Sequence, residues 1–345
     1  MRVSFLHVAC ALLLAACGGG GHAGGQAAPP GITVAQLNTL HGSLGGCMRT
    51  DNCRLADRLD LLFDWIGDSG CPDIVTLQEV WTKSAPMIMD RLGDACPFTY
   101  EAMRGNRGLG VDDEMILSRY PMLDSEHHSL LSGFRKVLWV RVDHPLGPLD
   151  VFTTHLASSS DGGPSPCGTA FPSECVAAGA VTRRDCQAVQ LAAFAEARHD
   201  VDTPAVIAGD FNAEPGSFIY RTFTERGWSD VYLAAGNPEC DPTSGVGCTS
   251  GRQDQSLVDL ESPASNEIER IDFIFLVPPR NLVPPRNGFA CTVQLDPASD
   301  RDGDGSATRI FTDLPNPFAP ACGPAPLPVC WPSDHEGVEL DLNCG

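Results

Sequence analysis

The stretch AVIAGDFN, residues 205–212, places a carboxylate and a carboxamide at the end of an apolar run. The run 205–208 is short and wholly apolar, which is typical of a strand buried on both faces. Asp210 and Asn212 follow directly, at a place where a polar side chain needs a partner or contact with water. We therefore expect these two side chains to meet a cation, a substrate or the ends of other strands.

Five further short apolar runs also begin or end beside polar residues. Their length and β-branched content predict strands at 32–37, 73–77, 149–154, 270–276 and 337–342. The polar residues at these strand ends are Asn38, Gln78, Glu79, His155, Asp272, Ser333, Asp334 and His335. Apolar residues spaced by three and four predict helices at 53–70 and 185–200. Strands that alternate with helices favour an α/β layered domain.

The polar strand ends supply oxygen ligands and histidines. Carboxylate and carboxamide oxygens suit Mg²⁺, Mn²⁺ or Ca²⁺. Two histidines with an available aspartate suit proton transfer and contact with an oxyanion. The chain has no G-x-S-x-G sequence, and its cysteines are better explained as structural. These features indicate metal-assisted attack of water on a phosphate ester.

The chain resembles the endonuclease/exonuclease/phosphatase superfamily, which includes DNase I-like nucleases, abasic-site endonucleases, sphingomyelinases and inositol polyphosphate phosphatases. The resemblance extends over about residues 32–343. It is carried by motifs that occur in one order: Asn38, Gln78-Glu79, ILSRYP at 116–121, Thr154-His155, Gly209-Asp210-Phe211-Asn212, Ile271-Asp272 and Ser333-Asp334-His335. The resemblance implies an α/β fold class, namely a four-layer α/β/β/α sandwich of two facing mixed β-sheets with outer helices (DNase I-like). The active site is then expected at one rim.

The resemblance also implies catalytic roles. Asp210 and Asn212 are similar to the pair that orients or activates the attacking water and contacts the phosphate. His335 resembles a histidine that is paired with a strand carboxylate, here Asp272. His155 resembles a second histidine, which contacts the phosphate and helps to protonate the leaving group. Which histidine acts as acid and which as base stays open.

Two groups of residues are candidates for metal binding. Glu79, with Asn38 and Asp334 close by, resembles the family's group for Mg²⁺ or Mn²⁺. Separately, an acidic insertion near 296–306 matches the first half of a calcium loop, with oxygens at alternate positions at Asp300, Asp302 and Asp304. The glutamate that should close such a loop is replaced by Phe311. A structural Ca²⁺ and a plain acidic turn are therefore both open.

The N-terminus predicts export. Residues 1–17 have the pattern of a lipoprotein signal peptide, whose apolar stretch ends in the lipobox Leu14–Cys17. Cys17 would then carry lipid and anchor the chain to the cell envelope, whereas cleavage as an ordinary signal peptide would give a secreted protein. Residues 18–31 are predicted to be a flexible Gly/Pro tether, and residues 32–345 one catalytic domain.

Cysteine usage agrees with export. Of 15 cysteines, 13 remain once Cys10 and Cys17 are set aside, and an exported chain with so many usually forms disulfides. Because 13 is odd, at least one thiol is expected to be free or paired outside the chain. Close pairs that suit loop staples are Cys47/Cys53, Cys167/Cys175, Cys240/Cys248 and Cys322/Cys330. The spacings lack paired C-x-x-C sequences, which argues against zinc.

The charge is strongly acidic, with 23 basic and 44 acidic residues. This argues against extended electrostatic binding to nucleic acid or anionic lipid, although a divalent cation in the site would still admit a phosphate. We predict a metal-dependent phosphodiesterase that acts on a nucleic acid or on a phospholipid such as sphingomyelin. The alternative is a non-catalytic cell-surface binding protein that keeps the fold. A monomer without a stable protein partner is expected.

Overall fold

The computed structural model describes residues 31–41, 47, 51–68, 70–102, 113–131, 134–158, 171–200, 202–252, 257–278, 291–293, 308–310 and 329–344. The predicted signal peptide with Cys17 lies outside the described residues. So do nearly all of the predicted tether and the acidic insertion with Asp300, Asp302 and Asp304. Those predictions therefore stay predictions.

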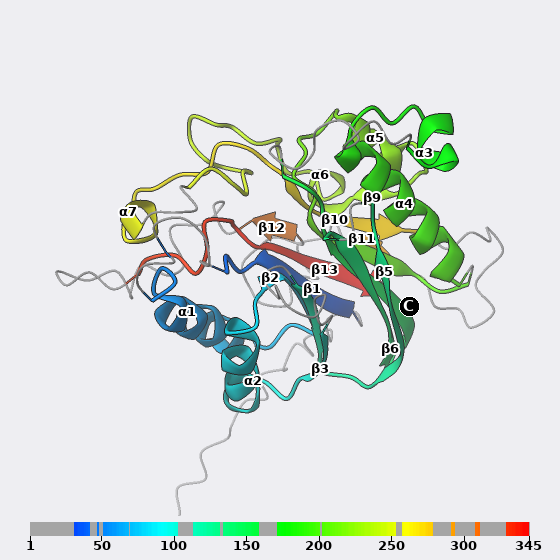
Figure 1. Ribbon diagram of the computed structural model, residues 1–345. Helices are drawn as coiled ribbons and strands as arrows, with labels where there is room; N and C mark the ends of the chain where they lie inside the picture. The colour runs from blue at the N-terminus through cyan, green and yellow to red at the C-terminus, as the bar shows by residue number, and fades with distance from the viewer. Residues whose placement is uncertain are drawn as a thin grey trace, which may run out of the picture.

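Two mixed sheets form the framework of the described chain (Figure 1). The strands of the first are β1 Gly31–Asn38, β2 Ile74–Val80, β3 Thr99–Ala102, β4 Asp113–Ser118, β11 Cys291–Val293, β12 Thr308–Ile310 and β13 Val338–Cys344. Their order is β11-β13-β1-β2-β4-β3, with β12 also beside β13. All six predicted strands are present, and their ends differ from the prediction by at most three residues.

The second sheet contains β5 Met122–Ser129, β6 Lys136–His144, β7 Gly147–His155, β8 Ala205–Asp210, β9 Ser229–Asp230 and β10 Asp272–Val277. Their order is β5-β6-β7-β8-β10-β9. The pair β7 and β8 runs parallel, as does the pair β1 and β2 in the first sheet, and the other neighbours described run antiparallel.

Helices cover the outer face of each sheet. The longer ones are α1 Leu55–Asp68, α2 Ser84–Ala95, α4 Arg183–Arg198 and α5 Phe218–Thr224, and the short ones are α3 Ser173–Ala177, α6 Val231–Ala234 and α7 Leu257–Leu260. Apolar residues of α1 and α2 pack on the first sheet, and those of α4 and α5 pack on the second. The helices predicted at 53–70 and 185–200 are thus confirmed as α1 and α4.

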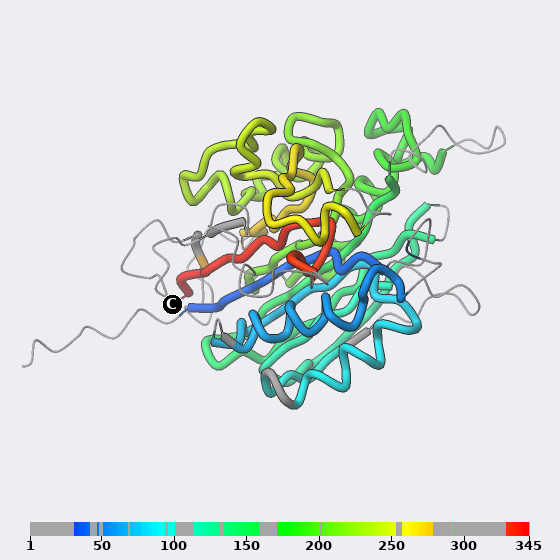
Figure 2. Tube along the Cα trace, turned by 90° about the vertical axis from the view of Figure 1, so that its left-hand side faces the viewer, coloured from blue at the N-terminus to red at the C-terminus, as the bar shows by residue number. Residues whose placement is uncertain are grey.

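Side-chain alternation along the strands builds the four layers. In β1, Ile32 and Val34 belong to the core between the two sheets, whereas Ala35 and Leu37 pack beneath α1. Successive side chains of a strand point to opposite faces, so a fully apolar strand has helix on one side and sheet on the other. The two helical layers lie on opposite sides of the sheets in the turned view (Figure 2). The predicted α/β/β/α sandwich is confirmed.

Strand register brings the polar strand ends to one rim. Asn38 lies beside Gln78 in the parallel pairing of β1 and β2. His155 lies beside Asp210 in the pairing of β7 and β8, and Asp272 lies opposite Asp210 in the antiparallel pairing of β10 with β8. The carboxyl ends of parallel strands meet at the same edge of a sheet, and the start of the antiparallel strand β10 lies at that edge as well, so these residues converge.

Gly209 is required by this pairing. Its φ is 154°, and a Cβ built there would lie 2.1 Å from the carbonyl oxygen of Thr154 on the neighbouring strand. No side chain fits in that space. The glycine of the G-D-F-N motif therefore lets β8 approach β7 closely enough to bring Asp210 beside His155.

Disulfides tie several loops to the sandwich. Those with both cysteines described are Cys47–Cys53, Cys71–Cys96, Cys175–Cys186, Cys240–Cys248 and Cys291–Cys344. The first and fourth were predicted. The predicted pairing of Cys175 with Cys167 is wrong, because α3 packs on the first turn of α4 and so places Cys175 against Cys186. Cys330 is also disulfide-bonded, and its predicted partner Cys322 lies outside the described residues.

Candidate active site

Asp272 and His335 form the centre of the rim. His335 Nδ1 lies 2.8 Å from Asp272 Oδ2, and His335 Nε2 lies 3.8 Å from Asp210 Oδ2. Burial alone would lower the pKa of His335, but the charges of Asp272 and Asp210 outweigh it and hold that pKa well above 6.5. The two carboxylates therefore favour the protonated form of His335.

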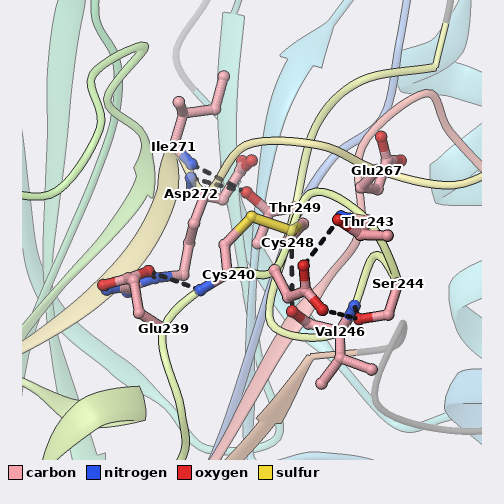
Figure 3. Close-up of a disulfide and its surroundings, with 12 residues drawn as sticks. Glu239, Cys240, Thr243, Ser244, Val246, Cys248, Thr249, Glu267, Ile271 and Asp272 are labelled. Carbon is pink, nitrogen blue, oxygen red and sulfur yellow. Dashed lines mark hydrogen bonds and ion pairs between the residues drawn. A yellow bond between two sulfur atoms is a disulfide. The ribbon is translucent and has the colours of Figure 1, made fainter.

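Asp272 is held from several sides. Its Oδ1 accepts a hydrogen bond of 3.1 Å from Gln36 Nε2, and its backbone amide donates to Thr249 Oγ1 over 3.1 Å. Burial raises the pKa of the Asp272 carboxyl, while the charge of His335 and the hydrogen bond with the Thr249 side chain oppose that rise. Figure 3 shows Thr249 next to Cys248, with its hydroxyl at the amides of Ile271 and Asp272.

A buried polar network links the two sheets beneath the site. Gln36 Nε2 also donates to Gln78 Oε1 over 2.7 Å, and Gln78 Nε2 donates to Thr153 Oγ1 over 2.8 Å. Gln36 and Gln78 belong to the first sheet, whereas Thr153 and Asp272 belong to the second. Hydrogen bonds between fully buried groups fix geometry, because an unmade bond there is costly. The network therefore sets how the two halves of the site face each other.

Asn38 joins the acidic groups of both sheets. Its Nδ2 donates to Glu79 Oε1 over 3.2 Å and to Asp210 Oδ2 over 3.1 Å. The backbone amide of His41 donates to Glu79 Oε2 over 3.0 Å, and His41 Nε2 lies 3.4 Å from the same oxygen. The carboxylate of Glu79 is thus oriented by three nitrogen atoms, and both of its oxygens are engaged.

Glu79 adopts a backbone conformation that disfavours glutamate. Its φ is 56°, in the left-handed region that non-glycine residues rarely occupy and that costs of order 1–3 kcal/mol. The pairing of β2 with β4 is also irregular between Leu77 and Val80, which surround it. Such strain persists where the surrounding structure holds it, and it concentrates at functional sites. Backbone geometry, as well as the sequence, therefore indicates that Glu79 is a functional residue.

Asp210 and Asn212 form a rigid turn at the end of β8. The backbone amide of Asn212 donates to Asp210 Oδ1 over 2.8 Å, and its Nδ2 donates to the carbonyl of Leu156 over 3.0 Å. Arg184 Nη1 donates to the carbonyl oxygens of Asn212 and Ala157, so it connects the segments that follow β8 and β7. Burial lowers the pKa of Arg184, and the charge of Asp210 opposes this.

His155 completes the set on the other side of Asp210. Its Nε2 lies 3.3 Å from Asp210 Oδ2, and the side chain is buried. The histidines His155 and His335 thus approach the same carboxylate oxygen from different strands. This arrangement can hold and move protons on both sides of a bound phosphate.

The segment with Asp334 is fixed by short-range bonds and a buried charged cluster. Ser333 Oγ donates to Asp334 Oδ1 over 3.2 Å and accepts from the amide of His335 over 3.2 Å. Directly after them, Glu336 shares the guanidinium of Arg252 with Glu267. Burial and the nearby Glu336 raise the pKa of Glu267 to about 8, against the lowering effect of Arg252. One guanidinium does not neutralise two buried carboxylates, which is why the pKa of Glu267 is raised although Arg252 is in contact with it.

The donor set of the rim fits a divalent cation. Asp210, Asp272 and, in its neutral form, His335 each offer a ligand atom within 4.8 Å of the others, and Glu79 joins them through Asn38. Asp210 and Asp272 are almost fully buried, and both form ion pairs with histidines. Such closely grouped oxygen donors are the chemistry that Mg²⁺ and Mn²⁺ prefer.

The structure brings together the candidates that the sequence named. Contacts connect Asn38, Glu79, His155, Asp210, Asn212, Asp272 and His335 into one site, with Asp334 beside His335. Sequence reasoning missed Gln36, Thr249 and Arg184. A glutamine inside an apolar strand was a signal for Gln36, whereas Thr249 lies in a loop without any pattern that marks it.

The fold and the site define a phosphoester hydrolase of the α/β/β/α type. The chain belongs to the endonuclease/exonuclease/phosphatase family, whose model matches residues 35–335. Among solved structures, it is similar to D. rerio TDP2 in complex with single-strand DNA product, with 18% identity, a TM-score of 0.56 and coverage of 91% of this chain and 99% of that one.

Two further structures show the same fold. The Bacteroides thetaiotaomicron mannosyl-6-phosphatase Bt3783 is 17% identical, with a TM-score of 0.56 and coverage of 91% of this chain and 99% of that chain. The human Nocturnin catalytic domain with bound sulfate is 18% identical, with a TM-score of 0.55 and coverage of 92% and 94%. No curated protein sequence matches the chain significantly. At these identities the likeness shows the fold alone.

Proposed function

We propose that the protein is an exported, divalent-metal-dependent phosphodiesterase in which an activated water attacks the substrate phosphorus. The proposal rests mainly on one observation: three nitrogen atoms converge on Asp210 Oδ2. His155 Nε2 lies 3.3 Å away, His335 Nε2 lies 3.8 Å away, and Asn38 Nδ2 lies 3.1 Å away. Asp210 thus lies between Asn38 and both histidines, which supports its proposed role at the position where water and phosphate would meet.

Glu79, Asn38 and Asp334 are the residues that would hold Mg²⁺ or Mn²⁺. Glu79 and Asp334 offer carboxylate oxygens, and Asn38 orients Glu79 through Nδ2. The bound ion would supply positive charge for the phosphate and for the charge that develops on it during attack. Without a cation, the carboxylates of Asp210 and Asp272, which offer ligand atoms within 4.8 Å of each other, repel one another, which supports metal dependence. The separate Ca²⁺ loop at Asp300, Asp302 and Asp304 remains a proposal from sequence.

Asp210 and Asn212 would handle the attacking water. The Asn212 amide occupies Asp210 Oδ1, so Oδ2 faces the site and is suited to accept a proton from water. His335, whose protonated form is favoured by Asp272, would donate to a phosphate oxygen as negative charge builds there. His155 would give its proton to the leaving alkoxide, which is the step that a diester needs most.

Export and the cellular location are part of the proposal. Five disulfides between described residues support an oxidising compartment. The N-terminal pattern supports lipid attachment at Cys17, with secretion as the alternative. No helix in the described part of the chain is long and apolar enough to cross a membrane. We further propose that the protein acts as a monomer.

The test is a substrate panel with defined metals. Bis-p-nitrophenyl phosphate, p-nitrophenyl phosphate, single-stranded DNA, RNA and sphingomyelin are each incubated with Mg²⁺, Mn²⁺, Ca²⁺ or EDTA. We expect diester hydrolysis with Mg²⁺ or Mn²⁺ that vanishes in EDTA and returns when metal is added back. Asp210→Asn, which is close to isosteric, serves as the inactive control. Full activity in EDTA after confirmed metal loss contradicts the proposal, and inactivity on every substrate favours a binding protein.

A further inference from the structure

Arg58 is a buried cation on the first turn of α1, and its side chain is only 1% exposed. Its Nε donates to the carbonyl of Cys53 over 2.7 Å. Nη1 donates to the carbonyls of Thr39 and Pro332, over 2.7 and 3.0 Å. Nη2 donates to those of Leu40 and Asn52, over 2.8 and 3.2 Å. A guanidinium has five N–H donors, and here five backbone carbonyls accept from it.

These carbonyls belong to three segments, and two of them lead to the metal-side residues. Thr39 and Leu40 directly follow Asn38 at the end of β1, and Pro332 precedes the Ser333-Asp334 pair. Backbone amides of the first segment complete the site, because the Leu40 amide donates to Asn38 Oδ1 over 3.0 Å and the His41 amide donates to Glu79. Arg58 therefore holds the backbone from which the acidic side chains are oriented.

Backbone strain is concentrated on the same acceptors. Leu40, Asn52 and Cys53 have φ values of 48°, 59° and 53°, in the left-handed region. For residues other than glycine this conformation persists only where neighbouring bonds hold it. Three of the five carbonyls bound by Arg58 thus come from strained residues. The guanidinium supplies the bonds that hold them there.

Charge gives Arg58 a second connection to the site. Burial lowers the pKa of Arg58 to about 10, and the charges of Asp334, Glu79 and Asp51 oppose this. Arg58 consequently stays charged at neutral pH although water does not reach it. A buried charge is costly unless hydrogen bonds compensate it, and an apolar side chain here would leave five carbonyls without their donor. Its bonding pattern therefore points to a role beyond packing.

We propose that Arg58 is a positioning residue for the metal-binding group: it preorganises the loop after β1 and the segment before Asp334, so that Glu79 and Asp334 are in place before a cation arrives. This inference rests on the proposed function, because it concerns the affinity of that site for Mg²⁺ or Mn²⁺. Preorganised ligands bind more tightly, since less freedom is lost on binding.

The decisive variant is Arg58→Lys, which keeps the charge but offers three donors from one nitrogen instead of a planar fork. Binding of Mn²⁺ to the protein without substrate is measured by calorimetric titration. We expect at least tenfold weaker binding. The matched control is Ile66→Ala, a fully buried position on the same helix, which should lower the melting temperature without changing Mn²⁺ affinity. Equal Mn²⁺ affinity in the wild type and Arg58→Lys overturns the inference.

The wild type separates this inference from the proposed function. If the wild type does not bind Mn²⁺, the proposed function fails and the inference fails with it. If the wild type binds Mn²⁺ and Arg58→Lys binds it equally tightly, the proposed function stands and only the positioning role of Arg58 is overturned. Hydrogen exchange on the metal-free wild type gives a second test that needs no variant. We expect slow exchange of the Leu40 and His41 amides, and exchange as fast as in an unfolded peptide overturns preorganisation.

Discussion

His335 Nδ1 lies 2.8 Å from Asp272 Oδ2, although 63 residues separate the two in sequence. The pair forms where the segment before β13 crosses the start of β10, and Ser250 bridges to His335 on one side and Glu269 on the other. The bond sets which ring nitrogen faces Asp272 and leaves Nε2 directed towards Asp210. The side chains therefore act as one unit, and this has a measurable consequence.

His335→Ala should lower kcat/KM on a diester at least about 10²-fold, the usual scale for an acid–base group. Asp272→Asn should cost less, and the double variant should be little worse than His335→Ala, because the two residues share one function. Melting temperatures are measured alongside. Retention of more than about a tenth of the wild-type activity by His335→Ala would show that the residue only supports the loop.

Glu79→Asn should abolish activity while the protein stays as stable as the wild type or becomes more stable. Asparagine tolerates the left-handed backbone at φ 56° better than glutamate, and the change removes one charge from an acidic rim. These gains offset the lost contacts of the carboxylate with Asn38 Nδ2, the His41 amide and the His41 ring. Thermal unfolding and diester hydrolysis are compared without metal and with Mg²⁺. A large fall in stability would mean that Glu79 holds the fold rather than the reaction.

Gly209→Ala should cost about 3 kcal/mol or more, because the new Cβ would lie 2.1 Å from the Thr154 carbonyl oxygen. Gly216→Ala is the matched control, since its φ is 80° but nothing lies within 4 Å of a built Cβ. We expect about 1 kcal/mol there. Urea unfolding of both variants measures the difference. Similar losses in the two would show that space at Gly209 is not limiting.

Stability should fall as the pH rises from about 4.5 to about 8, in part through Glu267. Its pKa is raised from 4.5 to about 8 by burial, so in this window the folded protein keeps a proton that the unfolded chain has lost. The unfolded state then binds fewer protons, and the free energy of unfolding decreases with pH. Glu267→Gln should flatten this dependence by at least about 1 kcal/mol. Urea unfolding at pH 5 and pH 8 is the measurement, and an unchanged slope contradicts the assignment.

Reduction should lower the melting temperature by several degrees. The Cys71–Cys96 disulfide joins the segment after α1 to the end of α2 and closes a loop of 25 residues, for which about 3 kcal/mol is expected. The double variant Cys71→Ser/Cys96→Ser should therefore lose more stability than Cys240→Ser/Cys248→Ser, whose loop spans 8 residues. Thiol titration of the denatured, unreduced protein provides the control, and nearly complete thiol reactivity would refute the disulfides.

The sequence by itself predicted six of the described strands, the helices α1 and α4, and the candidate site residues from Asn38 to His335. Short apolar runs that end in polar residues predict buried strands whose ends carry chemistry, because an unpartnered polar group at such a position is costly. Asp210 and Asn212 could be recognised in this way without any structure. The family resemblance then implied the four-layer arrangement of the sheets and helices and the roles of the site residues, which local sequence patterns do not contain.

Only the tertiary structure decided which distant residues meet. Gln36 donates to Asp272, and the Asp272 amide donates to Thr249. Arg58 donates to five backbone carbonyls. Each of these contacts joins segments that are far apart in sequence or that carry no recognisable pattern. The pairing of Cys175 with Cys186 instead of Cys167 has the same origin. Spacing along a chain sets which residues are available, but packing of sheets and helices sets which atoms come within bonding distance.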